Sequence, residues 1–232
     1  MKKIIILILL LIQSSFIFAS EEIYLEKAPI DLTDQPSLQK GARTFINYCL
    51  NCHSAKYMRY NKLLDIGLSK KDIKDNLLFT GEKIGDPMEI SMPVNESKKW
   101  FGAAPPDLSV VARSRGTDWI YSYMKGFYRD SSREIGWNNI VYVNSAMPHI
   151  LWELQGEQKL DEKTGKLRLI KAGKLNQKEY DSVITDLTNF IAYMSEPGQL
   201  KRKKIGFYVV GFLLLLLVLT VKLKKEFWKD IK

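Results

Sequence analysis

Apolar residues recur at helical spacing along much of the chain, which predicts a mainly α-helical protein. This spacing covers four stretches before the last third of the chain: residues 37–49, 62–75, 108–114 and 118–127. Two other stretches lack a steady period and contain Gly and Pro, so we expect long loops there: residues 80–107 and 129–150.

The clearest predicted helix runs from Asn176 to about Ser195. Asn176 is a suitable N-cap and Glu179 completes a capping box. A Pro-Gly pair at residues 197–198 ends the helix. Its apolar side chains form one stripe: Tyr180, Val183, Ile184, Leu187, Phe190, Ile191 and Met194. One small β-hairpin is expected before this helix, over residues 159–171.

An uninterrupted apolar run covers Ile205–Val221. As a helix it reaches about 26 Å, and with Lys222 snorkelling it approaches the ~30 Å hydrocarbon core of a bilayer. A buried core helix is the alternative, but it fits poorly, because a helix that is apolar on all sides would need partners all around it. We therefore expect a transmembrane anchor at residues 205–223, a basic linker at 201–204 before it and a cytoplasmic tail at 224–232.

The N-terminus has the pattern of a secretory signal peptide. Lys2 and Lys3 precede a short apolar run over residues 4–12, and small residues follow. We expect removal of residues 1–19, with an uncleaved anchor as the alternative. Export then places residues 20–200 outside the cytoplasm as one domain.

The net charge of +9 at neutral pH does not indicate a nucleic-acid-binding protein. The basic excess lies in the terminal segments, and residues 20–200 carry equal numbers of acidic and basic side chains. Those terminal charges suit export and membrane attachment. We expect a membrane protein with no nucleic acid partner.

The candidate chemistry lies at Cys49 and Cys52, which are followed by His53 in a C-x-x-C-H pattern. Two thiols three residues apart on a helical turn can bond the two vinyl groups of one porphyrin, and the histidine can ligate the iron. A thioredoxin-like pair would need a βαβ context, which is absent. A tetrahedral zinc site needs four ligands, and His149 is the only other Cys or His. A plain disulfide would leave His53 unexplained.

A second axial ligand must come from elsewhere in the chain. Met92 and Met147 each precede a proline in irregular sequence, where a thioether can be presented to the iron. Met147 is preferred, because a late loop can fold back across the haem face opposite His53, but the residues alone leave Met92 open. Histidine–methionine ligation leaves no coordination position of the iron free for a substrate, which suits electron transfer. An enzyme or gas sensor with an open iron is the alternative class.

Four separated segments carry a family resemblance. They are YCLNCHS with YMRYN (residues 48–61), APPDLS with the stretch that follows it (104–121), AMPH (146–149) and FWKD (227–230). In this order they resemble cytochrome c1, the haem subunit of the bacterial cytochrome bc1 complex (ubiquinol:cytochrome c oxidoreductase). The resemblance covers nearly all of residues 30–232.

The resemblance implies a cytochrome c-like haem domain with one covalent haem c, ligated by His53 and Met147. It also implies that Arg115 partners a haem propionate and that Pro106 lines the haem edge. The chain would be an electron carrier without acid, base or nucleophilic residues. It would be an enzyme only as a subunit of the oxidoreductase.

The implied partners are cytochrome b, a Rieske iron–sulfur protein and a cytochrome c acceptor, within a dimeric complex. The implied location is the bacterial inner membrane, with a single span, the haem domain in the periplasm and the C-terminus in the cytoplasm. A tethered monohaem cytochrome that feeds another oxidase or reductase is the nearest alternative. A zinc- or disulfide-stapled binding module is a more distant one.

Overall fold

The computed structural model describes residues 24–230, which are mainly helical as the sequence predicts. The predicted signal peptide, residues 1–19, lies outside the described residues. The helices are α2 (Gln35–Thr44), η2 (Phe45–Cys49), η3 (Tyr60–Ile66), α3 (Lys70–Asn76), α4 (Val94–Phe101), α5 (Val111–Arg115), α6 (Thr117–Lys125), α7 (Trp152–Gln155), α8 (Gln177–Ser195) and α9 (Gln199–Phe227). The strands are β1 (Ala55–Arg59), β2 (Pro87–Met88), β3 (Phe127–Arg129), β4 (Trp137–Asn139), β5 (Gly156–Asp161) and β6 (Lys166–Ala172).

The predicted helix over residues 37–49 is present as two joined segments. Asp34 caps α2 by accepting the Ser37 N–H at 3.0 Å. After Thr44 the backbone widens into the π-helix η2, closed by the Leu50 N–H donating to the Phe45 carbonyl at 2.9 Å. Such π-segments occur frequently at functional sites. Here the segment leads directly into the C-x-x-C-H turn.

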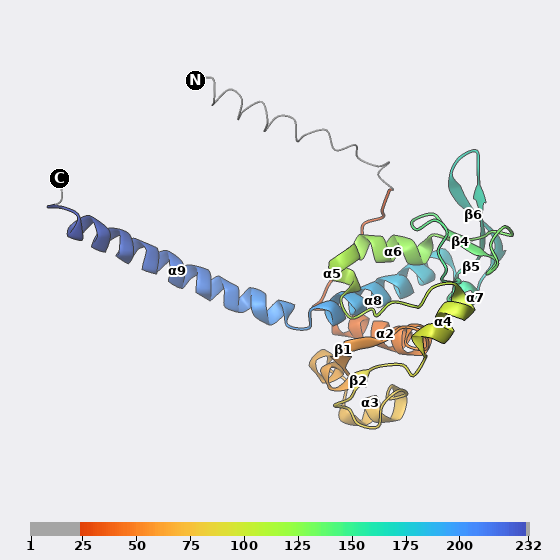
Figure 1. Ribbon diagram of the computed structural model, residues 1–232, viewed down its shortest axis with the longest axis horizontal. Helices are drawn as coiled ribbons and strands as arrows, with labels where there is room; N and C mark the ends of the chain where they lie inside the picture. The colour runs from red at the N-terminus through yellow and green to blue at the C-terminus, as the bar shows by residue number, and fades with distance from the viewer. Residues whose placement is uncertain (1–23, 231–232) are drawn as a thin grey trace, which may run out of the picture.

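Helix α8 is the central helix of the domain and packs against α2 and α6 (Figure 1). Its predicted capping box is present, with Asn176 and Glu179 each accepting the other's backbone N–H. The predicted apolar stripe is buried, except for Val183, which is half-buried.

The helices α2 and α8 approach closely at Gly41. A Cβ atom at this position would lie 2.0 Å from the Asp186 carbonyl oxygen and 2.7 Å from the Phe190 Cβ. The absence of a side chain therefore allows the two helices to touch along their backbones. Phe45 and Phe190 pack beside this crossing, with ring centroids 5.7 Å apart.

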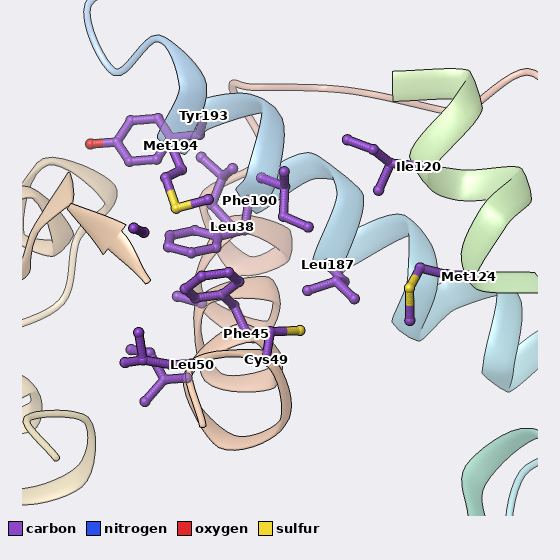
Figure 2. Close-up of a cluster of buried hydrophobic side chains, with 14 of the residues drawn as sticks. Leu38, Phe45, Cys49, Leu50, Ile120, Met124, Leu187, Phe190, Tyr193 and Met194 are labelled. Carbon is purple, nitrogen blue, oxygen red and sulfur yellow. The ribbon is translucent and has the colours of Figure 1, made fainter. Parts of the chain in front are cut away.

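The hydrophobic core fills the space between α2, α6 and α8 (Figure 2). Cys49 lies at its edge, one turn beyond Phe45, and its sulfur points to the side on which Leu187 of α8 lies. The core thus fixes the backbone from which the first cysteine of the motif projects.

Three small antiparallel sheets complete the fold: β1–β2, β3–β4 and β5–β6. The β5–β6 pair is the predicted hairpin, with the Gly165 N–H donating to the Asp161 carbonyl at 2.8 Å in the turn. The other two sheets were not expected. In β4 both Asn138 and Asn139 are buried through side-chain hydrogen bonds, so the strand has no apolar alternation to detect.

The prediction of one long loop over residues 80–107 is wrong in part, because α4 and β2 lie within it. Only Ser97 of α4 is buried, whereas Val94 and Trp100 are largely exposed. A helix that buries so few side chains has no apolar stripe in its sequence from which it could be predicted.

Helix α9 is long and apolar enough to span a membrane, and none of its residues is buried. It leaves the domain at the end away from the β5–β6 hairpin (Figure 1). The predicted span at residues 205–223 lies inside this helix. Residues 201–204, expected as a linker, form part of its first turns.

Candidate haem site

A cavity of about 350 Å³ lies among six segments of the domain. They are the 48–53 turn, residues 101–108, helices α5 and α6, the 142–150 loop and helix α8. Most of its lining is apolar, including Leu108, Val111, Ile120, Ile150, Leu187 and Ile191. Cofactor sites of roughly 300–1,000 Å³ with a few convergent polar groups have this character.

All six residues proposed from the sequence line this cavity: Cys49, Cys52, His53, Pro106, Arg115 and Met147. They come from four of the six segments, up to 98 positions apart in the chain. Met92, the other candidate for the second iron ligand, does not line the cavity, and neither does His149.

The two cysteines lie on one tight turn. The Cys49 carbonyl accepts the N–H groups of Cys52 and His53, at 3.1 and 2.9 Å. Cys49 is buried and Cys52 is partly exposed, and both are free thiols. Burial, together with the neighbouring Cys52, raises the pKa of the Cys49 thiol to about 12, so it stays protonated at neutral pH.

The His53 ring is oriented by Pro106. Its Nδ1 lies 2.8 Å from the Pro106 carbonyl oxygen. Because a carbonyl can only accept, Nδ1 carries the proton and Nε2 is the nitrogen with a lone pair for a metal. Burial lowers the pKa of His53, which favours the neutral imidazole that ligation requires.

Arg115 lies at the rim of the cavity among aromatic rings. Its guanidinium carbon is 5.2 Å from the Trp119 ring centroid and 5.9 Å from that of Tyr142. The side chain is exposed and makes no ion pair with another described residue. Its five N–H donors are therefore available to an anion in the cavity.

Two methionine thioethers reach the cavity, one from Met147 in the irregular loop and one from Met124 in α6. Met58 and Met88 are fully buried in the β1–β2 pair instead. Met124 is buried in α6. Met147 is the one of the pair that lies in irregular chain and is followed by a proline.

The sequence did not reveal the residues that hold the Met147 loop. Tyr123 and Ser145 share a buried hydrogen bond of 2.7 Å, and the Ser145 hydroxyl accepts the Met147 N–H at 3.2 Å. The one available signal was the i, i+4 spacing of the aromatic residues Trp119 and Tyr123 in α6 and Phe127, which begins β3 just after it. His149, expected in a loop, is buried and stacks on Phe127 with centroids 4.8 Å apart.

Within residues 24–230 no three His, Cys, Asp or Glu side chains are grouped so that they could hold a metal ion. The tetrahedral zinc alternative therefore lacks its ligands in the described part of the chain.

The sequence also matches a known protein family over most of its length. The sequence model described as "Cytochrome C1 family" matches residues 24–89 and 81–231. The chain belongs to the cytochrome c1 family.

Two relatives match this cytochrome c1-family chain over its whole length and theirs. One, 47% identical over 233 residues, is named "Ammonia monooxygenase gamma subunit" in Nitrosomonas europaea. The other, 44% identical over 243 residues, is named "Cytochrome c1" in Allochromatium vinosum. A chain of a "Hyperthermophilic respiratory Complex III" structure aligns over 100% of this chain and 98% of its own, at 14% identity and a TM-score of 0.43, too remote to bear on function.

Membership of the cytochrome c1 family implies a haem c, and the residues of the cavity fit one. The fit rests on the chemistry of the donors: two free thiols on one turn, an imidazole whose Nδ1 is already bonded, and a thioether at the same apolar cavity.

Proposed function

We propose that the chain carries one covalent haem c and passes single electrons within a ubiquinol:cytochrome c oxidoreductase. It would accept electrons from a Rieske iron–sulfur protein and reduce a cytochrome c. The observation that supports this most is the convergence of Cys49, Cys52, His53 and Met147 on one cavity. Family membership supports the same assignment.

Each residue has a specific task in this proposal. Cys49 and Cys52 would hold the porphyrin, His53 would bind the iron through Nε2, and the Met147 thioether would be its second protein ligand. The hydrogen bond to Pro106 fixes the His53 tautomer and ring orientation. The apolar lining keeps water from the iron. The bound haem supplies the one-electron chemistry of its iron.

Arg115 is proposed as the partner of a haem propionate. A guanidinium presents parallel N–H donors that match a carboxylate. The rings of Trp119 and Tyr142 hold the cation at the cavity rim through contacts of 5.2 and 5.9 Å.

The membrane arrangement follows from the two apolar segments. With residues 1–19 acting as an export signal, the haem domain would lie in the periplasm. The helix α9 would then cross the inner membrane once and leave the C-terminus in the cytoplasm. This tether would keep the domain beside cytochrome b in a dimeric complex.

The test is to purify the tagged full-length chain from its native membrane in mild detergent. We expect a dihaem cytochrome b and an iron–sulfur protein to copurify, and the preparation to reduce cytochrome c with quinol. The chain alone should lack quinol oxidation activity. Isolation of the haem-bearing chain with neither partner would contradict the assignment to this complex.

A second candidate is a membrane-tethered monohaem carrier that serves another oxidase or reductase. The name of the Nitrosomonas europaea relative favours it, because that name refers to a monooxygenase. Copurification with a different oxidoreductase, and no quinol-dependent reduction of cytochrome c, would select this candidate.

An open-iron enzyme or gas sensor makes a different spectroscopic prediction. If Met147 closes the iron, the ferrous protein should bind carbon monoxide slowly and weakly. Rapid carbon monoxide binding, with no methionine–iron charge-transfer band in the ferric protein, would overturn the electron-carrier assignment.

A further inference from the structure

A pair of buried hydroxyl groups connects helix α6 to the loop that carries Met147. The Tyr123 and Ser145 hydroxyl oxygens lie 2.7 Å apart, and these residues are only 8% and 2% exposed. The Ser145 hydroxyl also accepts the Met147 backbone N–H at 3.2 Å. The backbone of the proposed ligand is thereby linked to a side chain of α6 through one serine.

The Tyr123 end of this link is rigid. Its ring stacks on Trp119, with centroids 4.8 Å apart and planes 8° from parallel, and it meets Phe127 edge-on at 4.9 Å. Its carbonyl accepts the Asn139 side-chain N–H at 2.7 Å. The same Asn139 carboxamide oxygen accepts the Val141 N–H at 2.8 Å, so it also holds the beginning of the loop.

The loop is held on the other side of Met147 as well. Two residues later, the His149 ring stacks on Phe127 and meets Trp137 edge-on at 5.1 Å. Phe127 is therefore in contact with both Tyr123 and His149. The segment from Ser145 to His149 is fixed at its two ends by contacts to one aromatic cluster.

We propose that Tyr123 and Ser145 are positioning residues that hold the Met147 thioether where it can ligate the haem iron. The inference rests on the proposed function, because it concerns the same site. A loop that is free to move would lose backbone conformational entropy when its methionine becomes a ligand. Hydrogen bonds that order the loop in advance reduce that cost.

The hydroxyl pair can act in this way over the whole range in which the protein would be assayed. Burial raises the pKa of Tyr123 to about 12, so its hydroxyl keeps its proton. The bond therefore does not depend on pH near neutrality.

The experiment uses the full-length holoprotein with Tyr123→Phe, Ser145→Ala and the double variant. Tyr123→Phe removes only the hydroxyl and keeps the ring contacts with Trp119 and Phe127. The matched control is Tyr193→Phe. It removes a hydroxyl that donates a 2.9 Å hydrogen bond to the Lys62 carbonyl, and Tyr193 does not line the cavity. The readouts are the methionine–iron charge-transfer band, the midpoint potential and the rate of carbon monoxide binding.

We expect Tyr123→Phe and Ser145→Ala each to shift the equilibrium between methionine-bound and methionine-free iron by about three- to tenfold. This factor corresponds to the free energy of one hydrogen bond. The band weakens, the potential falls and carbon monoxide binds faster. The double variant should resemble Ser145→Ala, because both single changes break the same link. Tyr193→Phe should leave all three readouts at wild-type values.

Wild-type readouts in both Tyr123→Phe and Ser145→Ala would overturn the positioning role. Equal changes in Tyr193→Phe would also overturn it, because the effect would then reflect general loss of stability. A wild-type protein without the methionine–iron band would instead contradict the proposed ligation by Met147. The two failures are therefore distinguishable.

Discussion

At the scale of single residues, the site separates the tasks of attachment, ligation and orientation. Cys49, Cys52 and His53 lie within one turn, and Pro106 orients the imidazole from another segment. Met147 comes from a loop almost 100 positions away. Of the proposed ligands, Met147 therefore depends most on the tertiary fold for its position.

Met147→Ala should open the iron. We expect loss of the methionine–iron band, a lower midpoint potential and rapid carbon monoxide binding, because the thioether favours the reduced state. Met92→Ala is the matched control, since it removes another Met-Pro methionine that does not line the cavity. Normal spectra for Met147→Ala, with altered spectra for Met92→Ala, would reverse the ligand assignment.

Arg115→Gln should lower the midpoint potential, because loss of a cation near the haem disfavours the added electron. It should also lower the unfolding free energy of the holoprotein by about 1–2 kcal/mol, the worth of hydrogen bonds to a charged group. Arg113→Gln on the same helix is the control, since that exposed side chain does not line the cavity. Potentiometric titration and thermal melting measure the two effects, and equal potentials for both variants would contradict the propionate contact.

The residues found from the sequence and those missed differ in how far their roles depend on tertiary contacts. The cysteines and His53 have a local pattern, and all six proposed residues do line one cavity. Tyr123, Ser145 and Asn139 have no such pattern. Their roles come from contacts between positions 16 to 22 apart that only the folded chain brings together.

At the scale of elements, the contact between α2 and α8 fixes the base of the haem cavity. Cys49 follows α2 through the π-segment, and Leu187 and Ile191 of α8 line the cavity wall. The distance between these two helices therefore decides the position of the first cysteine relative to the opposite wall.

Gly41→Ala should separate these helices, because its Cβ would lie 2.0 Å from a backbone oxygen of α8. We expect a destabilisation of about 2–3 kcal/mol, the upper part of the range for overpacking in a core. Chemical denaturation of the holoprotein measures it. Gly198→Ala, where a Cβ would meet nothing within 4 Å, is the control. Equal stability of Gly41→Ala and wild type would show that the helices tolerate separation.

Elements with strong periodicity were predictable, whereas those without it were not. The amphipathic helices α2, α6 and α8 each bury an apolar face, so their sequence carries the 3.6-residue period. The short strands β1 to β4 and helix α4 bury too few apolar side chains in sequence to produce a period. Their stability depends on hydrogen bonds and contacts made across the fold.

At the scale of the whole molecule, a formally neutral domain is joined to a basic membrane helix. Many carboxylates of the domain accept hydrogen bonds from groups in their own turns. Hydrogen bonds from hydroxyl groups or backbone N–H groups in these turns hold five carboxyl pKa values below the usual range: those of Asp31, Asp72, Asp86, Asp130 and Asp161.

This pattern predicts that acid destabilises the domain. A carboxylate whose pKa is lower in the folded state contributes stability above its unfolded pKa, near 4, and loses it as the pH falls through the folded value. Thermal melting of the detergent-solubilised protein should therefore give a lower midpoint at pH 3 than at pH 6. In Asp130→Asn this loss should be smaller. A midpoint that rises toward pH 3 would contradict the prediction.

We propose that one haem is bonded covalently to Cys49 and Cys52. The most direct test is mass spectrometry of a tryptic digest of the protein purified from its native membrane. Cleavage after Arg43 and Lys56 releases residues 44–56, which contain both cysteines and His53. We predict that this peptide carries the mass of one haem. The same peptide with two unmodified thiols, or with a disulfide and no porphyrin, would contradict the account.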